Sequence, residues 1–252
     1  MTMRLSALLL AAACLPGGHA RAAELEILFP DMAPAILRKP DTGEVGGVVA
    51  ERVRAIAGRA GIDLVWNGPV PRARIVAELE TRPACTVNAI RTPERAARFL
   101  FTEPIFAPRR VAVITRSDPP WKTPPASFAA LLADRALVLG QMLGASHGEA
   151  IDRMIAQAGT PTQAFRGTPE DLLQLVAAGR VDYALGDLRD DRQLAEMMAA
   201  TRLEPGRLRV LHFPDLPAQE PGRIMCSHAV GGGVISTLDK AIAALGKDTS
   251  PP

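Results

Sequence analysis

The sequence predicts an α/β protein in which strands and helices alternate in two successive blocks. Three observations lead to this prediction: a strand–helix–strand pattern begins near residue 24, the alternation begins again near residue 110, and a tail of strands and one helix follows residue 206. The chain has 252 residues, of which 48% are hydrophobic and 22% are charged. This composition excludes a disordered or collagen-like chain, and the length is enough to bury a hydrophobic core.

The first block, about 24–108, opens with a strand–helix–strand unit. Leu25–Phe29 is a compact apolar run that predicts a strand. Apolar residues then recur at helical spacing over Val49–Ala60 and stop at Gly61, where a glycine is expected to end the helix. Ile62–Trp66 is the next predicted strand. A helix between two strands predicts that the strands run parallel.

The same block continues with a short helix, a strand and a second short helix. The helix is predicted from about Arg72 to Leu79, and the strand lies around Cys85. Thr92 is followed by a proline and a glutamate, which is a typical helix start with an N-cap and a proline in the first turn.

The second block, about 110–206, repeats this alternation. Val111–Thr115 is a predicted strand, Phe128–Ala133 a short helix, and Ala136–Gly140 a further strand. Ser146-His-Gly-Glu149 then matches a capping box, so we expect a helix to open there.

Similar signals organise the rest of the chain. Thr168 opens a helix that is predicted to end at Gly179. The remaining predicted elements are the strand Val181–Leu185, a helix through Leu194 and Met198, strands near Leu208–Phe213 and Arg223–Cys226, a flexible turn at Gly231–Gly233 and a last helix over Ser236–Leu245.

Residues 1–22 have the pattern of a cleaved secretory signal peptide. A short basic start precedes an apolar run over Leu5–Leu15, and Ala20-Arg-Ala22 is a small-x-small cleavage pattern. The apolar run is shorter than the roughly 20 residues that a membrane-spanning helix needs. A lipoprotein signal with an acylated Cys14 is the alternative, although the alanines before Cys14 lack the usual large aliphatic residue. We therefore expect export to the periplasm.

Export makes a disulfide between Cys85 and Cys226 the expected state of the two remaining cysteines. Both cysteines lie in short apolar segments that look like strands, and disulfides persist outside the cytosol. Two separate buried thiols are the alternative. The scattered histidines and the absence of a Cys-x-x-Cys motif argue against a metal site, and we expect no metal and no cofactor.

The net charge of the chain does not favour a strongly charged partner such as nucleic acid or a membrane surface. Residues 1–22 contain two arginines and no acidic residue, so the mature chain would have 27 basic and 27 acidic residues. We therefore expect no nucleic-acid partner. Only ten residues are aromatic, a scarcity that any account of ligand binding must meet.

The ordered set of short motifs resembles family 3 bacterial extracellular solute-binding proteins, the amino-acid-binding type of periplasmic binding protein. Each motif alone is weak, but their order along nearly the whole mature chain is fairly specific. The motifs are Gly46-Gly-Val48, Pro71-Arg-Ala-Arg74, Arg91-Thr-Pro-Glu-Arg95, Phe101-Thr-Glu-Pro104, Gly179-Arg-Val-Asp182 and Gly186-Asp187.

The resemblance implies the type 2 periplasmic-binding-protein fold, with two lobes, a mixed and mostly parallel sheet in each, and two hinge crossovers. We expect lobe I to comprise 24–108 plus 208–252 and lobe II to comprise 109–207. The implied function is hinge closure on a small amino-acid-like solute, without catalysis, by a monomer that delivers the solute to an inner-membrane ABC permease. Within such a cleft, arginines and few aromatic rings favour an anionic or zwitterionic solute over an aromatic or sugar-like one. The alternative is a sensor that passes its closed state to a membrane signalling partner.

The same resemblance suggests a set of ligand-binding residues. Arg95 matches the arginine that grips the ligand carboxylate, with a planar guanidinium suited to two parallel hydrogen bonds. Asp187 matches the acid that receives the α-amino group. Ala145 and Ser146 lie where relatives present backbone N–H groups at a helix N-terminus. Asp31, in the loop after the first strand, is a further candidate for a positive group of the ligand.

Two more candidates and several departures complete the expected site. Arg74 is a candidate ligand contact, with an ion pair at the lobe edge as the alternative. Asn88 stands where relatives have a hydrogen-bonding Gly-x-Thr strand, and Arg72 stands where an aromatic residue is common. Arg95 could instead be a solvated helix residue, and Asp187 could cap the following helix.

A serine hydrolase is the alternative from another functional class. Gly144-Ala-Ser-His-Gly148 matches G-x-S-x-G between a predicted strand and a predicted helix, which is the context of a nucleophile elbow at Ser146. Asp182 or Asp187, and then His212 or His228, would complete the order Ser, acid, His. No His-Gly-Gly oxyanion segment precedes the motif, and the capping box also explains Ser146.

Overall fold

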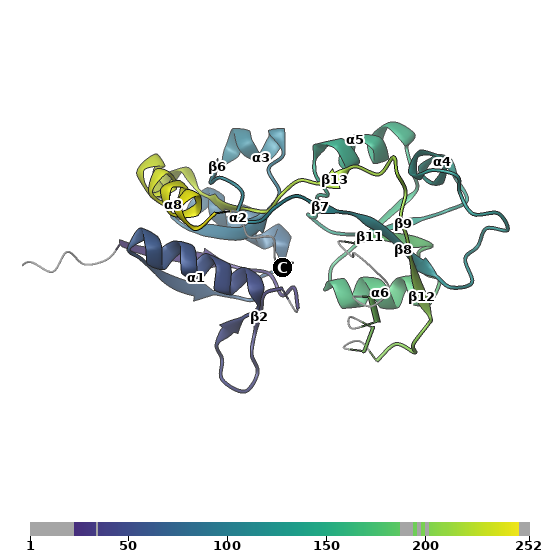
Figure 1. Cartoon of the computed structure of the whole chain (residues 1–252), viewed down its shortest axis with the longest axis horizontal. Coiled ribbons are helices and arrows are strands. Elements are labelled where there is room, and N and C mark those ends of the chain that lie inside the picture. Colours follow the sequence, from purple (N-terminus) through teal and green to yellow (C-terminus); the bar gives the residue numbers. More distant parts are fainter. Residues whose placement is uncertain (1–22, 34, 187–193, 196–197, 200–201, 247–252) are drawn as a thin grey trace, which may run out of the picture.

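The computed structural model of the chain has two lobes that are joined by a pair of strands (Figure 1). It describes residues 23–33, 35–186, 194–195, 198–199 and 202–246. Each lobe is built around a five-stranded sheet with helices on both faces.

The sheet of lobe I brings the N-terminal and C-terminal parts of the chain together. Three strands are parallel, and the return strand from the C-terminal part pairs antiparallel with two others. The strand order is β4 (Ile62–Asn67), β1 (Ala23–Leu28), β5 (Cys85–Ala89), β14 (Arg223–Cys226) and β6 (Leu100–Phe101).

Helices cover both faces of this sheet because each face presents an apolar cluster. On one face, α1 (Val48–Ala60) and α8 (Gly232–Leu245) share a core with β1 and β5. On the other face, α2 (Arg72–Thr81) packs through Ile75 and Leu79, and the short α3 (Pro93–Arg98) follows β5. A hairpin of β2 (Leu37–Arg38) and β3 (Val45–Gly46) precedes α1.

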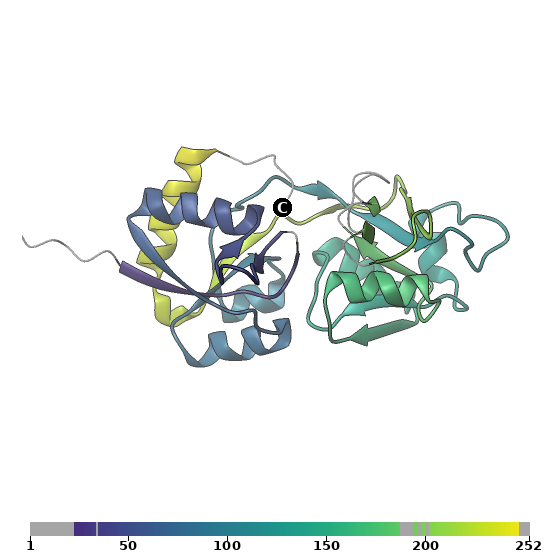
Figure 2. The same cartoon turned by 90° about the horizontal axis from the view of Figure 1, so that it is seen from below.

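Lobe II repeats this three-layer arrangement, as Figure 2 shows from a second direction. Its sheet has the order β10 (Thr162–Phe165), β9 (Leu139–Met142), β11 (Tyr183–Gly186), β8 (Ala112–Arg116) and β12 (Leu208–Leu211). The pairs β10–β9 and β9–β11 are parallel, whereas β8 is antiparallel to both of its neighbours. The helices α4 (Phe128–Ala133) and α5 (Glu149–Ala158) share one apolar cluster, and α6 (Pro169–Ala177) belongs to another.

The two connections between the lobes pair with each other as a short ribbon. β7 (Arg109–Arg110) and β13 (Ala218–Gln219) are antiparallel, with Arg110 opposite Ala218, and Figure 1 places them between the lobes. The boundary expected at residue 208 is therefore wrong. Leu208–Leu211 pairs with β8 inside lobe II, because its alternating apolar residues complete that sheet, and the chain returns to lobe I only after β13.

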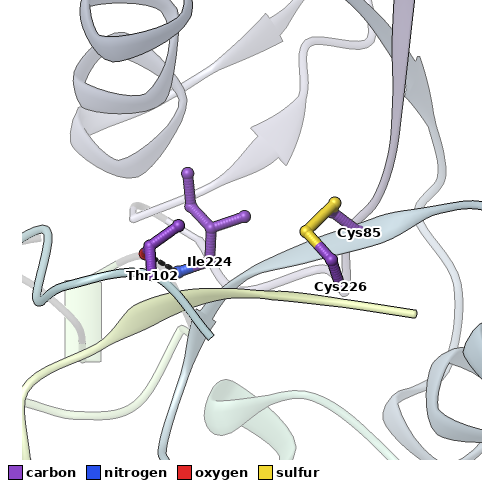
Figure 3. Close-up of a disulfide and its surroundings, with 4 residues drawn as sticks. All are labelled: Cys85, Thr102, Ile224 and Cys226. Atoms are coloured by element: carbon purple, nitrogen blue, oxygen red, sulfur yellow. Dashed lines mark hydrogen bonds between the residues drawn. A yellow bond between two sulfur atoms is a disulfide. The ribbon is translucent and has the colours of Figure 1, made fainter. Parts of the chain in front are cut away.

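The predicted disulfide is present and fastens the return strand to lobe I (Figure 3). Cys85 on β5 and Cys226 on β14 face each other directly and are fully buried. On the other side of β14, the backbone N–H of Ile224 donates to Thr102 Oγ1 at 3.1 Å. The C-terminal segment is thus held to lobe I by both covalent and hydrogen bonds.

Most predicted elements are present, and the differences lie at helix starts and short strands. The expected capping box at Ser146 is wrong: Gly148 is the N-cap of α5, and the Glu149 carboxylate instead pairs with Arg153. The helix predicted to start at Ser236 already starts at Gly232, so the glycine run is not wholly a turn. The sequence analysis missed β10, the β2–β3 hairpin and the 3-10 helix η1 (His228–Val230).

Within the described residues, no helix has the length and apolar character needed to cross a membrane.

Candidate functional site

Arg95 connects the two lobes. Thr92 caps α3 by accepting a hydrogen bond from the Arg95 backbone N–H at 3.3 Å, which fixes the first turn of the helix. The Arg95 side chain donates from Nη1 to the carbonyl oxygen of Ile90 at 3.0 Å, and from Nη2 to that of Gly144 at 2.8 Å. Ile90 belongs to lobe I and Gly144 to lobe II, so one guanidinium lies between them.

The lobe II side of this contact is the turn at residues 144–148, between β9 and α5. Gly144 and Gly148 have φ values of 77° and 102°, a region that strongly favours glycine. Within the turn, the Asp152 carboxylate accepts hydrogen bonds from the Ser146 hydroxyl and from the His147 backbone N–H, the latter at 3.0 Å. Asp152 therefore holds the turn against the first turn of α5.

The charges around this turn influence one another across the lobes. Burial lowers the pKa of Arg95, while the charges of Asp152 and Glu94 act to raise it. Burial also lowers the pKa of His147, with Asp152 acting to raise it and the positive Arg72 to lower it. Since Arg95 and Arg72 come from lobe I, both shifts reflect groups brought together from two lobes.

Arg72 is the first residue of α2 and faces the same turn. A methyl group on Gly144 would lie 3.8 Å from Arg72 Cβ. The Arg72 side chain is partly buried, and its Nη2 donates to the sulfur of Met32 at 2.5 Å. Burial and the charge of Arg95 lower the pKa of Arg72 to about 10, so the guanidinium remains protonated at neutral pH.

The other predicted ligand residues lie in different surroundings. Ala145 and Ser146 belong to the turn beside Arg95 and are partly buried. Asp31 is exposed in the loop after β1. Arg74 is exposed and pairs with Glu78 at 2.6 Å, which is the alternative that the sequence left open. Asp187 lies outside the described residues.

Asn88 has an unusual backbone conformation at the end of β5. Its φ is 53°, in the left-handed region that asparagine tolerates better than most residues. Its side chain packs against the second interlobe segment, because a methyl group on Gly222 would lie 1.9 Å from Asn88 Oδ1. Asn88 therefore contacts the connection between the lobes.

The sequence analysis missed His147 and Asp152 as members of the site and did not assign Arg72 a binding role. The sequence did point to Arg72, because an arginine stands there in place of the aromatic residue that is common in similar sequences. Asp152 gave a weaker signal, as an acid in the first turn of α5. Only the contact between the two lobes shows that Arg72, His147 and Asp152 lie close enough for their charges to interact.

The geometry at Ser146 does not form a catalytic triad among the described residues. Its hydroxyl donates to Asp152, an acid, and accepts from the Gly148 N–H at 3.1 Å. Asp182 instead accepts from the Val138 N–H at 2.8 Å. His212 and His228 are exposed, and no hydrogen bond links either to Ser146 in the described part of the chain. The G-x-S-x-G match is thus a turn fixed by Asp152.

The described residues contain no group of three or more His, Cys, Asp or Glu side chains that could hold a metal ion.

Comparison with known families decides how this two-lobed architecture is classified. Residues 28–200 match the bacterial extracellular solute-binding proteins, family 3. The chain belongs to this family. No curated protein is matched.

Solved structures of similar proteins share the fold of this solute-binding protein at low sequence identity. An ancestral arginine-binding protein bound to arginine has a TM-score of 0.68 and 16% identity, covering 89% of this chain and 93% of its own. An amino acid ABC transporter substrate-binding protein from Streptococcus pneumoniae, bound to L-arginine, has a TM-score of 0.64 and 18% identity, covering 88% and 89%. The BvgS periplasmic VFT2 domain of Bordetella pertussis has a TM-score of 0.66 and 20% identity, covering 90% and 88%.

Proposed function

We propose that this protein is a periplasmic solute-binding protein that closes on a small anionic or zwitterionic, amino-acid-like solute and delivers it to an ABC transporter. The position of Arg95 carries the proposal. Its partly buried guanidinium lies at the junction of the lobes and contacts two carbonyl oxygens. No ion pair to Arg95 is found among the described residues. A ligand carboxylate would supply the charged partner that a guanidinium prefers.

Ligand binding would favour the closed arrangement of the lobes. A carboxylate on Arg95 would also lie beside the turn at residues 144–148, where the N-cap of α5 is Gly148, a residue with no side chain to accept from the first N–H groups of the helix. The helix N-terminus favours negative charge. Because Arg95 and the turn come from different lobes, the ligand would contact both only when the lobes are closed, and its differential affinity would shift the hinge.

The remaining predicted contacts are proposed from the family resemblance. We assign Asp187 to the α-amino group of the ligand and keep Asp31 as a second candidate for that group. We keep Asn88, near the end of β5, as a candidate contact to the ligand. Arg74 is the weakest member of the set, since its carboxylate partner Glu78 already lies 2.6 Å away.

Binding is tested by a thermal-shift and calorimetry screen of amino acids and small carboxylates. A ligand at about 100 times its dissociation constant should stabilise the protein by about 2.7 kcal/mol. Arg95→Met should abolish most of this shift for the best ligand. Arg98→Met is the matched control, because Arg98 lies on the same helix but is exposed and paired with Glu94. Equal affinities of wild type and Arg95→Met would refute the carboxylate site.

The proposal includes no chemical conversion of the ligand. Incubation of the best ligand with an equimolar amount of protein, followed by NMR of the released ligand, should return it unchanged. Appearance of a new compound with wild type, but not with heat-denatured protein, would show an enzyme instead.

Transport and sensing are separated in cells that lack the gene. Loss of uptake of the labelled ligand, restored by the wild-type gene, supports delivery to an ABC transporter. Unchanged uptake with an altered transcriptional response to the ligand supports the alternative, a membrane signalling partner. The fold shared with the BvgS periplasmic domain makes this second outcome worth testing.

The compartment is tested by fractionation and N-terminal sequencing of the mature protein. We expect the protein in the periplasmic fraction, beginning at Ala23 after removal of residues 1–22. Retention in the membrane with a modified Cys14 would indicate a lipoprotein.

A further inference from the structure

Arg72 is a cation at the junction of the lobes that forms no ion pair within the described part of the chain. It lies at the first position of α2, and its neighbour Ala73 has a backbone nitrogen 3.7 Å from the position of a methyl group on Gly144. Its guanidinium donates to Met32 Sδ, and a thioether is a weak acceptor. No carboxylate of the described residues forms an ion pair with it. A partly buried cation in this state lacks the compensation that such groups usually have.

A second guanidinium, that of Arg95, is close enough to repel it. Burial and then the charge of Arg95 lower the pKa of Arg72 to about 10, so Arg72 stays positive at neutral pH. The guanidinium of Arg95 is positive as well, since arginine keeps its proton in proteins. The two residues come from different helices of lobe I, and both face Gly144 of lobe II. The fold therefore holds two like charges at one place.

Two of the described acids near this pair, Asp152 and Glu94, already have other partners. Asp152 accepts hydrogen bonds from the Ser146 hydroxyl and the His147 N–H. The Glu94 carboxylate pairs with Arg98 at 3.0 Å. Burial keeps the pKa of His147 low, so the ring is neutral near pH 7. Asp152, whose charge acts on both Arg95 and His147, is thus already hydrogen-bonded to the turn.

We propose that Arg72 is a second anion-binding residue and that the solute carries two carboxylates, as an acidic amino acid or another short dicarboxylate does. This inference rests on the proposed binding function. One carboxylate would lie on Arg95 and the other on Arg72, and each guanidinium would gain charge-assisted hydrogen bonds. A cationic side chain, such as that of arginine, would instead be placed beside a like charge.

Calorimetry with matched probes tests the charge preference. The dicarboxylate probes are L-glutamate, L-aspartate and succinate, the amide isosteres are L-glutamine and L-asparagine, and L-arginine is the cationic probe. We expect L-glutamate or L-aspartate to bind about tenfold or more tightly than its amide isostere, which corresponds to about 1.4 kcal/mol. Tighter binding of L-glutamine or L-arginine would overturn the dicarboxylate inference and leave the proposed binding function intact. No binding of any probe would count against both.

The role of Arg72 is tested by its effect on this preference rather than on stability. Arg72→Met keeps an unbranched apolar stem. It should weaken the binding of the better acidic amino acid by about tenfold or more, while changing the affinity for its amide isostere by less than about threefold. Arg72→Lys keeps the charge and should retain part of the preference. Arg59→Met, an exposed arginine on α1, controls for net charge. Equal weakening of both probes by Arg72→Met would mean a purely structural role and overturn the proposal.

Discussion

The Nη2 group of Arg95 donates a hydrogen bond to the carbonyl oxygen of Gly144 over 2.8 Å, from α3 in lobe I to the turn before α5 in lobe II. The same guanidinium is anchored to the Ile90 carbonyl at 3.0 Å. Arg95 therefore couples the conformation of the hinge to the group that we assign to ligand binding. A ligand carboxylate would compete with, or add to, this direct contact between the lobes.

Arg95→Met should open the lobes in the absence of ligand. A hydrogen bond of this kind contributes about 0.5–1.5 kcal/mol, and up to about 3 kcal/mol when one partner is charged, so the closed population should fall several-fold. Small-angle scattering should record a larger radius of gyration than for wild type. Arg98→Met should scatter like wild type. An unchanged radius for Arg95→Met would mean that the contact does not hold the lobes together.

Loss of the disulfide should destabilise lobe I strongly. Cys85 and Cys226 are 141 residues apart in the chain, and in the chain-entropy model a loop longer than 100 residues gives about 4 to 5 kcal/mol. The double variant Cys85→Ala/Cys226→Ala should unfold at a lower urea concentration. Reduction of the wild type should lower its midpoint to a similar degree. A midpoint that reduction leaves unchanged would contradict this role of the bridge.

The sequence predicted most of the fold because its signals were local. The apolar spacing over Val49–Ala60 and the glycine at 61 defined α1, and the N-cap at Thr92 defined the start of α3. The β12 strand shows what local signals cannot predict, which is the sheet that a strand joins. Its apolar pattern predicted a strand, but only pairing with β8 places it in lobe II, since pairing partners far apart in the chain leave no local signal.

A methyl group at Gly222 should strain the connection between the lobes. It would meet Asn88 Oδ1 at 1.9 Å, so Gly222→Ala should lower the free energy of unfolding by about 1–3 kcal/mol. Asn88→Gly suits the φ of 53° and removes the clashing atom. The double variant should recover most of the loss. Gly233→Ala, at a position with no atom within 4 Å, is the control.

An additive loss in the double variant would contradict the steric explanation, because two independent sites would show no recovery. Chemical denaturation of wild type, Gly222→Ala, Asn88→Gly and the double variant under the same conditions measures the coupling directly.

The candidate site was less predictable than the fold. The resemblance assigned Arg95 from a motif, and the structure brings Arg95 to Gly144 of the other lobe. The partners of His147 could not be deduced from sequence. Asp152 is on the following helix, whereas Arg72 lies on a different lobe and reaches the histidine only through closure of the two lobes.

His147 should make the protein less stable as the pH falls below about 6.5. Burial lowers its pKa in the folded protein, whereas in the unfolded chain the pKa is about 6.5. Between these values the unfolded state binds more protons, so the free energy of unfolding decreases on acidification and levels off below the folded pKa. His147→Gln should flatten this part of the profile. His228→Gln, an exposed histidine, controls for loss of any imidazole.

NMR titration of the His147 ring should then identify the charges that set its pKa. Arg72 acts to lower this pKa and Asp152 to raise it. Arg72→Met should therefore raise the measured pKa, and Asp152→Asn should lower it. Because these residues lie in different lobes, the Arg72 effect requires the lobes to be closed. Arg95→Met, which should open the lobes, should also remove the influence of Arg72. A His147 pKa that is insensitive to Arg72→Met would show that the two side chains are not neighbours in solution.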